Sequence, residues 1–133
     1  MRQLEEGVSV SGQIRPEEVA QLAAQGIRLI VNNRPDGEAP DQPSGSEIEA
    51  AAAAAGVGYR FVPVAQLTPQ AIEAMREALA GADGPVLAFC AVGTRSTYLW
   101  ALARSLQGAD GESLAAGAQA AGYDISPIRR FLR

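Results

Sequence analysis

The chain has 133 residues, of which 47% are hydrophobic and 20% charged, and its formal net charge at pH 7 is -4. This length and balance are typical of a soluble globular protein, and we expect one domain over residues 1–133. The acidic charge argues against a nucleic-acid groove, and the lack of about 18 consecutive apolar residues argues against a membrane span, so neither partner is expected.

The first half of the chain alternates strand and helix patterns. Residues 8–14 (VSVSGQI) alternate apolar and small polar side chains, which is typical of a short strand. Pro16 and the two glutamates after it then begin a helix, which Gly26 ends. Residues 27–33 (IRLIVNN) are rich in β-branched side chains and predict a buried strand. Residues 34–45 (RPDGEAPDQPSG) favour turns and predict a mobile loop.

The second half continues the alternation and indicates the fold class. The expected elements are a helix over 46–55, a strand over 59–64, a helix from Thr68-Pro69 to about residue 80, a strand over 85–90, a helix over 95–106, and one or two small C-terminal helices. Strands that alternate with helices imply a mostly parallel sheet covered on both faces. We therefore expect an α/β three-layer sandwich with about four to five strands. Ligands bind such sheets beyond the carboxyl ends of the strands.

The counts of histidine and cysteine restrict the chemistry. The chain has no histidine and one cysteine, Cys90. This excludes Ser-His-Asp and Cys-His catalysis and zinc sites built on imidazole or on several thiolates. We therefore expect no metal and no cofactor. A single cysteine forms no intramolecular disulfide and the N-terminus has no long apolar run, so we expect a cytoplasmic protein without a signal peptide.

Cys90 lies in the segment FCAVGTRST, residues 89–97, where a predicted strand passes into a predicted helix. The backbone N–H groups of such a turn converge on one point, beside the positive end of the helix, and can bind an oxyanion. Gly93 permits the turn, and Arg95 offers a two-pronged guanidinium to the anion. The same field favours the thiolate of Cys90, to which Ser96 can donate a hydrogen bond. The residues expected to form the anion-binding loop are Ala91, Val92, Gly93, Thr94 and Ser96.

A structural role for the cysteine remains an alternative. A lone cysteine at the end of an apolar strand is often a small core residue. The grouping Cys-x-x-Gly-x-Arg-Ser at a strand-to-helix junction favours the nucleophile instead.

These segments resemble the cysteine-dependent phosphatase superfamily, and most closely its bacterial branch, the beta-lactamase-hydrolase-like phosphatase domains. The resemblance covers residues 8 to about 127 and is carried by SGQI (11–14), GIRLIVNNRPDGE (26–38), GVGYRFVPV (56–64), GPVLAFC (84–90), GTRS (93–96) and GYDIS (122–126). GTRS alone is not specific, but the combination with SGQI and NNRPDGE is. The resemblance implies a protein tyrosine phosphatase-like sandwich in which Cys90 forms a phosphocysteine and Arg95 clamps the phosphate.

Three features depart from the superfamily pattern. Four residues separate Cys90 from Arg95, whereas phosphatases usually have five; four is the spacing of rhodanese-like sulfurtransferases. The histidine that usually precedes the nucleophile is Phe89. The general-acid aspartate of dual-specificity phosphatases has Ala65 and Gln66 in its place. A leaving alkoxide needs a proton, so either another acid supplies it or the leaving group is a good one.

Asp36 is the expected proton donor, and Glu38 is the next candidate. Asp36 follows a predicted strand, on a loop with Gly37 and three prolines that can close over the anion as a lid. The alternative that both carboxylates only belong to a solvated turn stays open.

Three functions fit these residues. The first is hydrolysis of a phosphoric monoester, either a phosphorylated protein or a small phosphate ester. The second is sulfurtransfer through a Cys90 persulfide, and the third is a non-catalytic anion or phosphopeptide binding module. Loop length favours the second, but the helical sequence after Leu106 favours the first, because rhodaneses usually continue there with a strand and a Gly-Gly turn. Family members also occur fused to metallo-beta-lactamase-like hydrolases of sulfur metabolism, which implies a sulfur-metabolism partner in trans.

Overall fold

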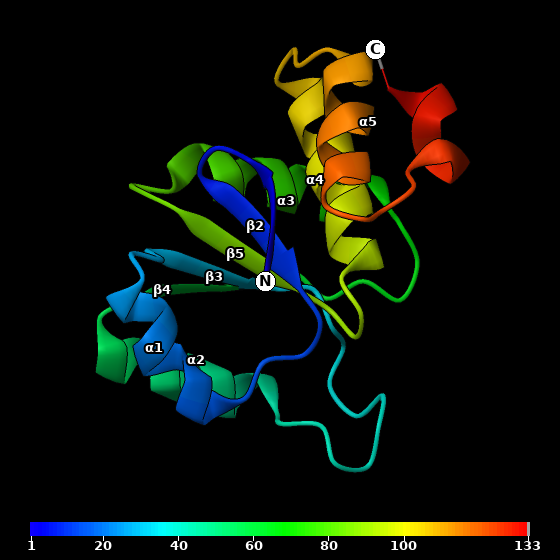
Figure 1. Cartoon of the computed structure of the whole chain (residues 1–133). Coiled ribbons are helices and arrows are strands. Elements are labelled where there is room, and N and C mark those ends of the chain that lie inside the picture. Colours follow the sequence, from blue (N-terminus) through cyan, green and yellow to red (C-terminus); the bar gives the residue numbers. More distant parts are fainter. Residues whose placement is uncertain (133) are drawn as a thin grey trace.

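The computed structural model describes residues 1–132, and its centre is a five-stranded sheet (Figure 1). The strands are β1 (Arg2–Glu5), β2 (Val8–Ser11), β3 (Leu29–Asn32), β4 (Gly58–Phe61) and β5 (Val86–Phe89). They lie in the order β1-β2-β5-β3-β4, and the described pairs are parallel except β1 with β2. The mostly parallel sheet is confirmed, whereas the short antiparallel strand β1 is an addition that the sequence patterns do not predict.

The helices begin and end close to the residues that their sequence signals predict. They are η1 (Pro16–Glu18), α1 (Val19–Ala24), α2 (Gly45–Ala55), α3 (Pro69–Gly81), α4 (Thr94–Leu106), α5 (Gly111–Ala120) and η2 (Ser126–Phe131). Thr68 caps α3 by accepting a hydrogen bond from the Ala71 N–H, and Gly56 ends α2 in the left-handed conformation. Within the described chain, every helix is too short or too polar to cross a membrane.

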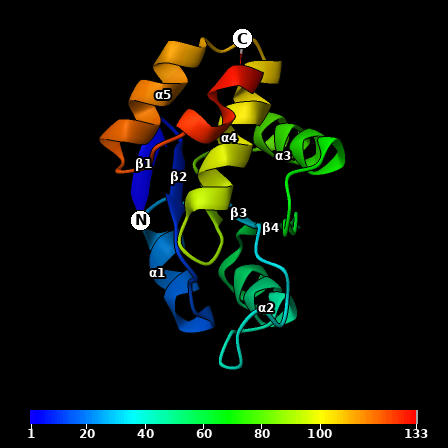
Figure 2. The same ribbon diagram turned by 90° about the vertical axis from the view of Figure 1, so that its right-hand side faces the viewer.

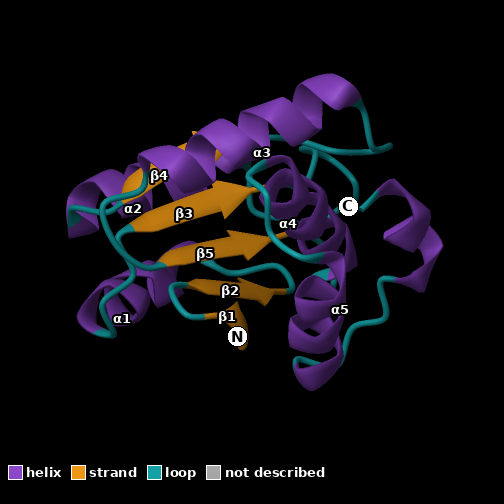
Figure 3. Ribbon diagram, turned by 90° about the horizontal axis from the view of Figure 1, so that it is seen from above, coloured by secondary structure: helices purple, strands orange, loops and turns teal. Residues whose placement is uncertain are grey.

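The two faces of the sheet carry separate hydrophobic clusters, which makes the expected three layers (Figure 1). Figure 3 looks down on the sheet and shows its strand order. Alternate residues of a strand point to opposite faces. In β5, Leu87 and Phe89 therefore pack towards α1 and α2, while Val86 and Ala88 pack towards α3, α4 and α5. Burying one such large side chain contributes roughly 1.5–3 kcal/mol to folding. This pattern explains why β5 reads as a continuous apolar run.

The strand register brings the site residues to one edge of the sheet. Ser11 at the end of β2 and Asn32 at the end of β3 both pair with Phe89 at the end of β5. The three strands therefore end at the same level, and the segments that follow them meet at the carboxyl edge of the sheet. Two of these segments are the loop after Phe89 and the long connection from β3 to α2.

The connection from β3 to α2, for which the composition predicts a mobile loop, contains hydrogen bonds between its own residues. The Gln42 side chain donates to the Pro35 carbonyl and accepts hydrogen bonds from the N–H groups of Glu38 and Ala39. Proline and glycine shape the turns here, and these side-chain hydrogen bonds link one turn to the next. Figure 2 shows this connection extending past the end of α2.

Candidate active site

Cys90 is fully buried, and its sulfur faces the loop that follows it. The Gly93 N–H donates a hydrogen bond to Sγ, with 3.1 Å between nitrogen and sulfur. The Cys90 N–H in turn donates to the Ser11 carbonyl, which fixes the start of the loop against β2. A core cysteine that only fills space does not need this contact.

Gly93 is the pivot of the loop. Its φ of +95° is one that a side chain rarely adopts, and it is the N-cap residue of α4. A Cβ at this position would also overlap the hydroxyl of Tyr123. That hydroxyl donates to the Val92 carbonyl over 3.1 Å, while the Thr97 hydroxyl donates to the Gly93 carbonyl over 2.8 Å. The turn is thus fixed by its own conformation and by side chains on two sides.

Ser96 does not donate to the sulfur as the sequence predicts. The structure has α4 starting at Thr94, which puts Ser96 inside the helix on a buried face. Its hydroxyl donates to Oδ1 of Asn33 over 2.8 Å. Asn33 also donates to the Val62 carbonyl, so this buried pair ties the β3 connection and the start of α4 to the chain after β4.

Arg95 holds a carboxylate in the fork of its guanidinium. Its two terminal nitrogens donate to the two oxygens of Glu38, over 2.7 and 2.9 Å, and one of them also donates to the Val64 carbonyl over 2.8 Å. The hydrogen bonds and charge of Glu38 raise the pKa of Arg95, and the nearby Cys90 adds to this effect. The arrangement is a two-pronged oxyanion contact, and the oxyanion is supplied by the protein itself.

Glu38 also contacts a second arginine. Oε1 of Glu38 accepts from Nε of Arg34 over 3.0 Å, in addition to its bond from Arg95. The bond from Arg95, and then the one from Arg34, lower the pKa of Glu38 from 4.5 to about 2 against the opposing effect of burial. Glu38 is therefore a carboxylate at neutral pH, and it occupies both donors of the Arg95 fork.

Asp36 lies elsewhere in the same segment. Its Oδ1 accepts a hydrogen bond from the N–H of Gly45, the first residue of α2, over 2.7 Å. This contact stabilises the start of the helix, where unpaired N–H groups favour a negative charge. Of the two carboxylates that the sequence offers as proton donors, the structure brings Glu38 to Arg95 and holds Asp36 at α2.

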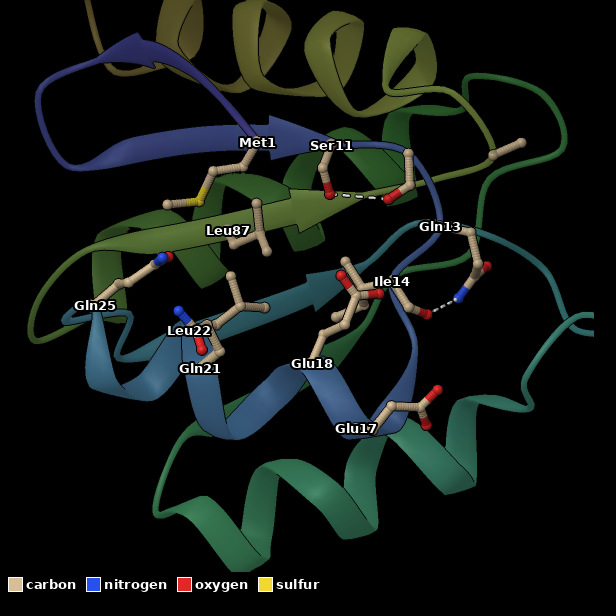
Figure 4. A pocket seen from close by; sticks show the side chains of 12 residues that line it. Met1, Ser11, Gln13, Ile14, Glu17, Glu18, Gln21, Leu22, Gln25 and Leu87 are labelled. Carbon is tan, nitrogen blue, oxygen red and sulfur yellow. Dashed lines mark hydrogen bonds between the residues drawn. The ribbon is translucent and has the colours of Figure 1, made fainter.

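An open groove of about 880 Å³ begins beside the Cys90 loop (Figure 4). Figure 4 places Gln13 at one end and Gln25 at the other, and Ala91, whose carbonyl accepts from the Gln13 N–H, also lines the groove. Polar side chains from η1 and α1, Glu18 among them, alternate with apolar ones along its wall. The groove thus offers both polar and apolar contacts next to the Cys90 loop.

Sequence reasoning did not assign roles to four of the residues that shape the site: Gln13, Asn33, Arg34 and Tyr123. A signal for them was present, since each belongs to a segment that carries the family resemblance, namely SGQI, NNRPDGE or GYDIS. Their contacts link segments far apart in the chain, and a local pattern cannot reveal such links. Over residues 1–132, no three His, Cys, Asp or Glu side chains come together in a way that could hold a metal ion.

A doubly covered α/β sheet with a Cys–Arg loop at the carboxyl ends of its strands defines a phosphatase-like domain. The chain belongs to the beta-lactamase hydrolase-like protein family, phosphatase-like domain, whose model matches residues 1–107. A beta-lactamase hydrolase-like protein of Xylella fastidiosa is 38% identical over 133 residues, which is 98% of this chain and 31% of that protein. The chain thus spans about a third of the length of this relative.

Solved structures agree with this assignment. The crystal structure of a candidate phosphatase from Neisseria meningitidis superimposes with a TM-score of 0.83 at 33% identity, over 97% of this chain and 93% of that one. The active form of Tk-PTP gives a TM-score of 0.65 at 18% identity, over 97% of this chain and 90% of that one. The second likeness concerns the fold alone, and it confirms the protein tyrosine phosphatase-like sandwich.

Proposed function

We propose that this domain is a cysteine-dependent phosphatase that hydrolyses phosphoric monoesters. The observation that supports this most is the pairing of Cys90 with Arg95. The Cys90 sulfur accepts a loop N–H, and the Arg95 guanidinium five residues later already binds an oxyanion with both prongs. A nucleophile and an anion clamp therefore lie on one turn of chain, as in-line transfer of a phosphoryl group requires.

The reaction proceeds in two displacements. The Cys90 thiolate attacks phosphorus, a sulfur–phosphorus bond forms, and the ester bond to the leaving oxygen breaks as that oxygen takes a proton. Water then attacks the phosphocysteine, loses a proton, and releases inorganic phosphate and the thiolate. Arg95 stabilises the equatorial oxygens in both steps, because its donors are oriented before the charge develops.

The loop backbone supplies the rest of the anion site. The residues proposed to contribute are Ala91, Val92, Gly93, Thr94 and Ser96. The first turn of α4 leaves N–H groups without helical partners, and the positive end of its dipole attracts an anion. Gly93 already directs its N–H at the Cys90 sulfur, so it is the donor best aligned with the reacting atom. Ser96 acts through its place in the helix, since its hydroxyl is bonded to Asn33.

The proton donor is proposed from the same pair of carboxylates, Asp36 and Glu38. Asp36 remains the sequence-based candidate, but it must leave the Gly45 N–H to reach a substrate. Glu38 is the stronger candidate by position, because a phosphate that binds Arg95 must displace it and then lies next to it. Once displaced, Glu38 lies beside a phosphate dianion in place of a cation, and a neighbouring like charge favours the protonated carboxyl.

Leaving-group dependence separates the two donors. Asp36→Asn and Glu38→Gln are compared on an alkyl phosphate and on p-nitrophenyl phosphate. A general acid contributes typically 10²–10⁴-fold with a poor leaving group and little with a good one. The variant that hydrolyses the alkyl phosphate much more slowly, but p-nitrophenyl phosphate at a nearly normal rate, identifies the acid. Equal losses on both substrates indicate a structural role for that carboxylate.

Sulfurtransfer is the second candidate, and one observation favours it: four residues separate Cys90 from Arg95, as in rhodanese-like enzymes. The deciding experiment compares aryl phosphate hydrolysis with thiosulfate-to-cyanide sulfur transfer, using Cys90→Ser as the blank in both. Hydrolysis without sulfur transfer supports the phosphatase, and the reverse result supports a persulfide on Cys90. Phosphate binding without either turnover supports an anion or phosphopeptide binding module.

The substrate is proposed to be a phosphorylated protein or a small phosphate ester. The groove of Figure 4 starts at Ala91 in the Cys90 loop and is the proposed site for the leaving group. Its side-chain amides and carboxylates favour a group with hydroxyl or amide donors. A sulfur-metabolism partner is proposed from the family resemblance, since the curated relative is about three times longer than this chain and so contains further sequence.

A further inference from the structure

A second guanidinium lies at the anion site beside that of Arg95. The Arg34 side chain is only 13% exposed, which is less than the 25% of Arg95. Its Nε donates to Oε1 of Glu38 over 3.0 Å, and a terminal nitrogen of Arg95 donates to that same oxygen over 2.9 Å. Two cationic forks therefore converge on one oxygen atom.

Two guanidiniums share a single carboxylate at this point. Arg34 and Arg95 carry two positive charges, and the Glu38 carboxylate carries one negative charge. A phosphate monoester carries about -1.5 to -2 at neutral pH and has three oxygens that accept hydrogen bonds. It matches the two arginines in charge and in number of acceptors better than a carboxylate does. Partial burial strengthens the match, because charges near the interior are screened less than those on the surface.

We propose that Arg34 is a second phosphate-positioning residue, which binds the substrate phosphate together with Arg95 after Glu38 has left. Glu38 is the internal anion that holds both guanidiniums in place in this structure. This inference rests on the proposed function of the same site and specifies its ligand as a dianionic phosphate held by two arginines.

Gln13 orients Arg34 towards the Cys90 loop. Its Oε1 accepts from a terminal nitrogen of Arg34 over 3.1 Å, and its own backbone N–H donates to the Ala91 carbonyl over 3.3 Å. The Gln13 amide is itself held by a bond to the Ile14 carbonyl, drawn in Figure 4. Arg34 is therefore connected to the loop through Gln13, and this connection does not depend on Glu38. The guanidinium keeps a defined position when the carboxylate leaves.

The simpler reading is that Arg34 only holds Glu38 and never touches a ligand. The two readings differ in what happens when Glu38 is absent. A purely structural Arg34 has no effect on phosphate binding once its carboxylate partner is removed. A phosphate-positioning Arg34 still contributes, because its ligand is then the phosphate.

The experiment is a double-mutant cycle with inorganic phosphate as the probe. Phosphate is titrated calorimetrically into the full chain, Arg34→Gln, Glu38→Gln and the double variant. Losing a hydrogen bond to a charged group typically weakens binding about 10- to 100-fold. We expect Arg34→Gln to weaken binding by about this factor and Glu38→Gln to tighten it. The double variant should bind about 10- to 100-fold more weakly than Glu38→Gln alone.

Equal affinity of the double variant and Glu38→Gln would overturn the inference, because Arg34 would then act only through Glu38. So would the absence of phosphate binding in both the full chain and Glu38→Gln. Arg34→Lys keeps the charge but loses the fork, and should recover only part of the affinity. Arg28→Gln is the matched control: Arg28 lies at the opposite end of β3, pairs with Asp83 on the surface, and should leave phosphate binding unchanged. Thermal unfolding of each variant checks that the fold is retained.

The same variants separate failure of this inference from failure of the proposed function. Arg34-dependent phosphate binding without hydrolysis of any ester would reject the phosphatase and keep the second arginine. Hydrolysis with an unchanged KM in Arg34→Gln would keep the phosphatase and reject the second arginine.

Discussion

Two segments at the carboxyl edge of the sheet are held in opposite ways. The turn after Cys90 is fixed by buried contacts that include its own backbone: the Gly93 N–H bonds to sulfur, and Thr97 bonds back to the Gly93 carbonyl. Beyond the buried Asn33–Ser96 hydrogen bond, the β3 connection meets the same site through partly exposed side chains, above all the Arg95–Glu38 pair. The contacts of the Cys90 turn are therefore fixed in the folded chain, whereas those of the β3 connection can be exchanged for a ligand.

The difference follows from what each contact would lose on breaking. A buried backbone N–H that loses its partner costs about 1–3 kcal/mol with nothing in return. A partly exposed ion pair contributes little net free energy, because water and a competing anion replace it readily. The two segments should therefore respond differently to substitution. Substitutions in the Cys90 turn should affect the reaction or the fold itself, and substitutions in the β3 connection should affect ligand binding and stability at acid pH.

The largest expected effect is on the nucleophile. Cys90→Ser is nearly isosteric and should retain the fold, but it should lower turnover of p-nitrophenyl phosphate by of order 10⁵–10⁶-fold, the loss typical when a covalent nucleophile is removed. Turnover close to that of the unmodified chain would return Cys90 to the role of a core residue. Circular dichroism and thermal unfolding of the variant provide the check on folding.

The next effect concerns the clamp that joins the two segments. Arg95→Lys keeps the charge but loses the planar fork, and should lower kcat/KM by about 10²–10³-fold. Arg76→Lys is the matched control, since Arg76 also pairs with a carboxylate, Glu73, but on the exposed surface of α3. Steady-state kinetics on one aryl phosphate measures both. An Arg95→Lys variant as active as the control would show that the fork does not bind the reacting phosphate.

One glycine in each segment allows the Cys90 turn and the β3 connection to be compared directly. Gly93 and Gly37 both have positive φ, +95° and +77°, but a Cβ at Gly93 meets Tyr123 whereas a Cβ at Gly37 meets nothing within 4 Å. Gly37→Ala should cost only about 1–2 kcal/mol of unfolding free energy, from the backbone conformation. Gly93→Ala should cost clearly more and abolish phosphate binding. Urea unfolding followed by the fluorescence of Trp100, the one tryptophan in the sequence, measures both. An equal loss of unfolding free energy in both variants would show that the Tyr123 side chain moves aside easily.

The smallest expected effect is a pH-dependent contribution of Glu38. Its pKa in the folded chain is about 2, below the ordinary value of 4.5, so the Arg95 contact stabilises the fold fully above about pH 4.5. That contribution is lost as the pH falls towards 2. The difference in unfolding free energy between the unmodified chain and Glu38→Gln should therefore shrink across this range. Glu6→Gln, in the turn between β1 and β2, serves as a surface control. A difference that stays constant with pH would contradict the ion pair.

The fold could be predicted where the signals are local. The apolar run of β5 and the Thr68 cap of α3 each specify their element within a few residues, and both predictions are confirmed. Strand β1 could not be predicted in the same way. Its sequence, RQLE, buries only Leu4 fully, and it becomes a strand because it pairs with β2 and packs beneath α5.

The site could be predicted only in its local half. Cys90, Gly93 and Arg95 lie within six residues, so their spacing alone suggests a common role. The contact between Glu38 and Arg95 spans 57 positions in the chain, and no periodicity encodes it. Which carboxylate of the RPDGE segment faces the guanidinium depends on how the turn folds. Here the Asp36 bond to Gly45 directs that side chain to α2 and leaves Glu38 for Arg95.

The helices at the C-terminus have a consequence for where this domain can be cut. The family model ends at residue 107, yet Leu114, Ala118 and Ile128, from α5 and η2, belong to the same core cluster as Leu4 and Trp100. Gly117 lies so close to the Leu4 carbonyl that a Cβ there would overlap it. The stretch that the family model matches is therefore shorter than the stretch that forms this core. A fusion or truncation joined at residue 107 would uncover the apolar side of α4, and a working boundary lies beyond η2.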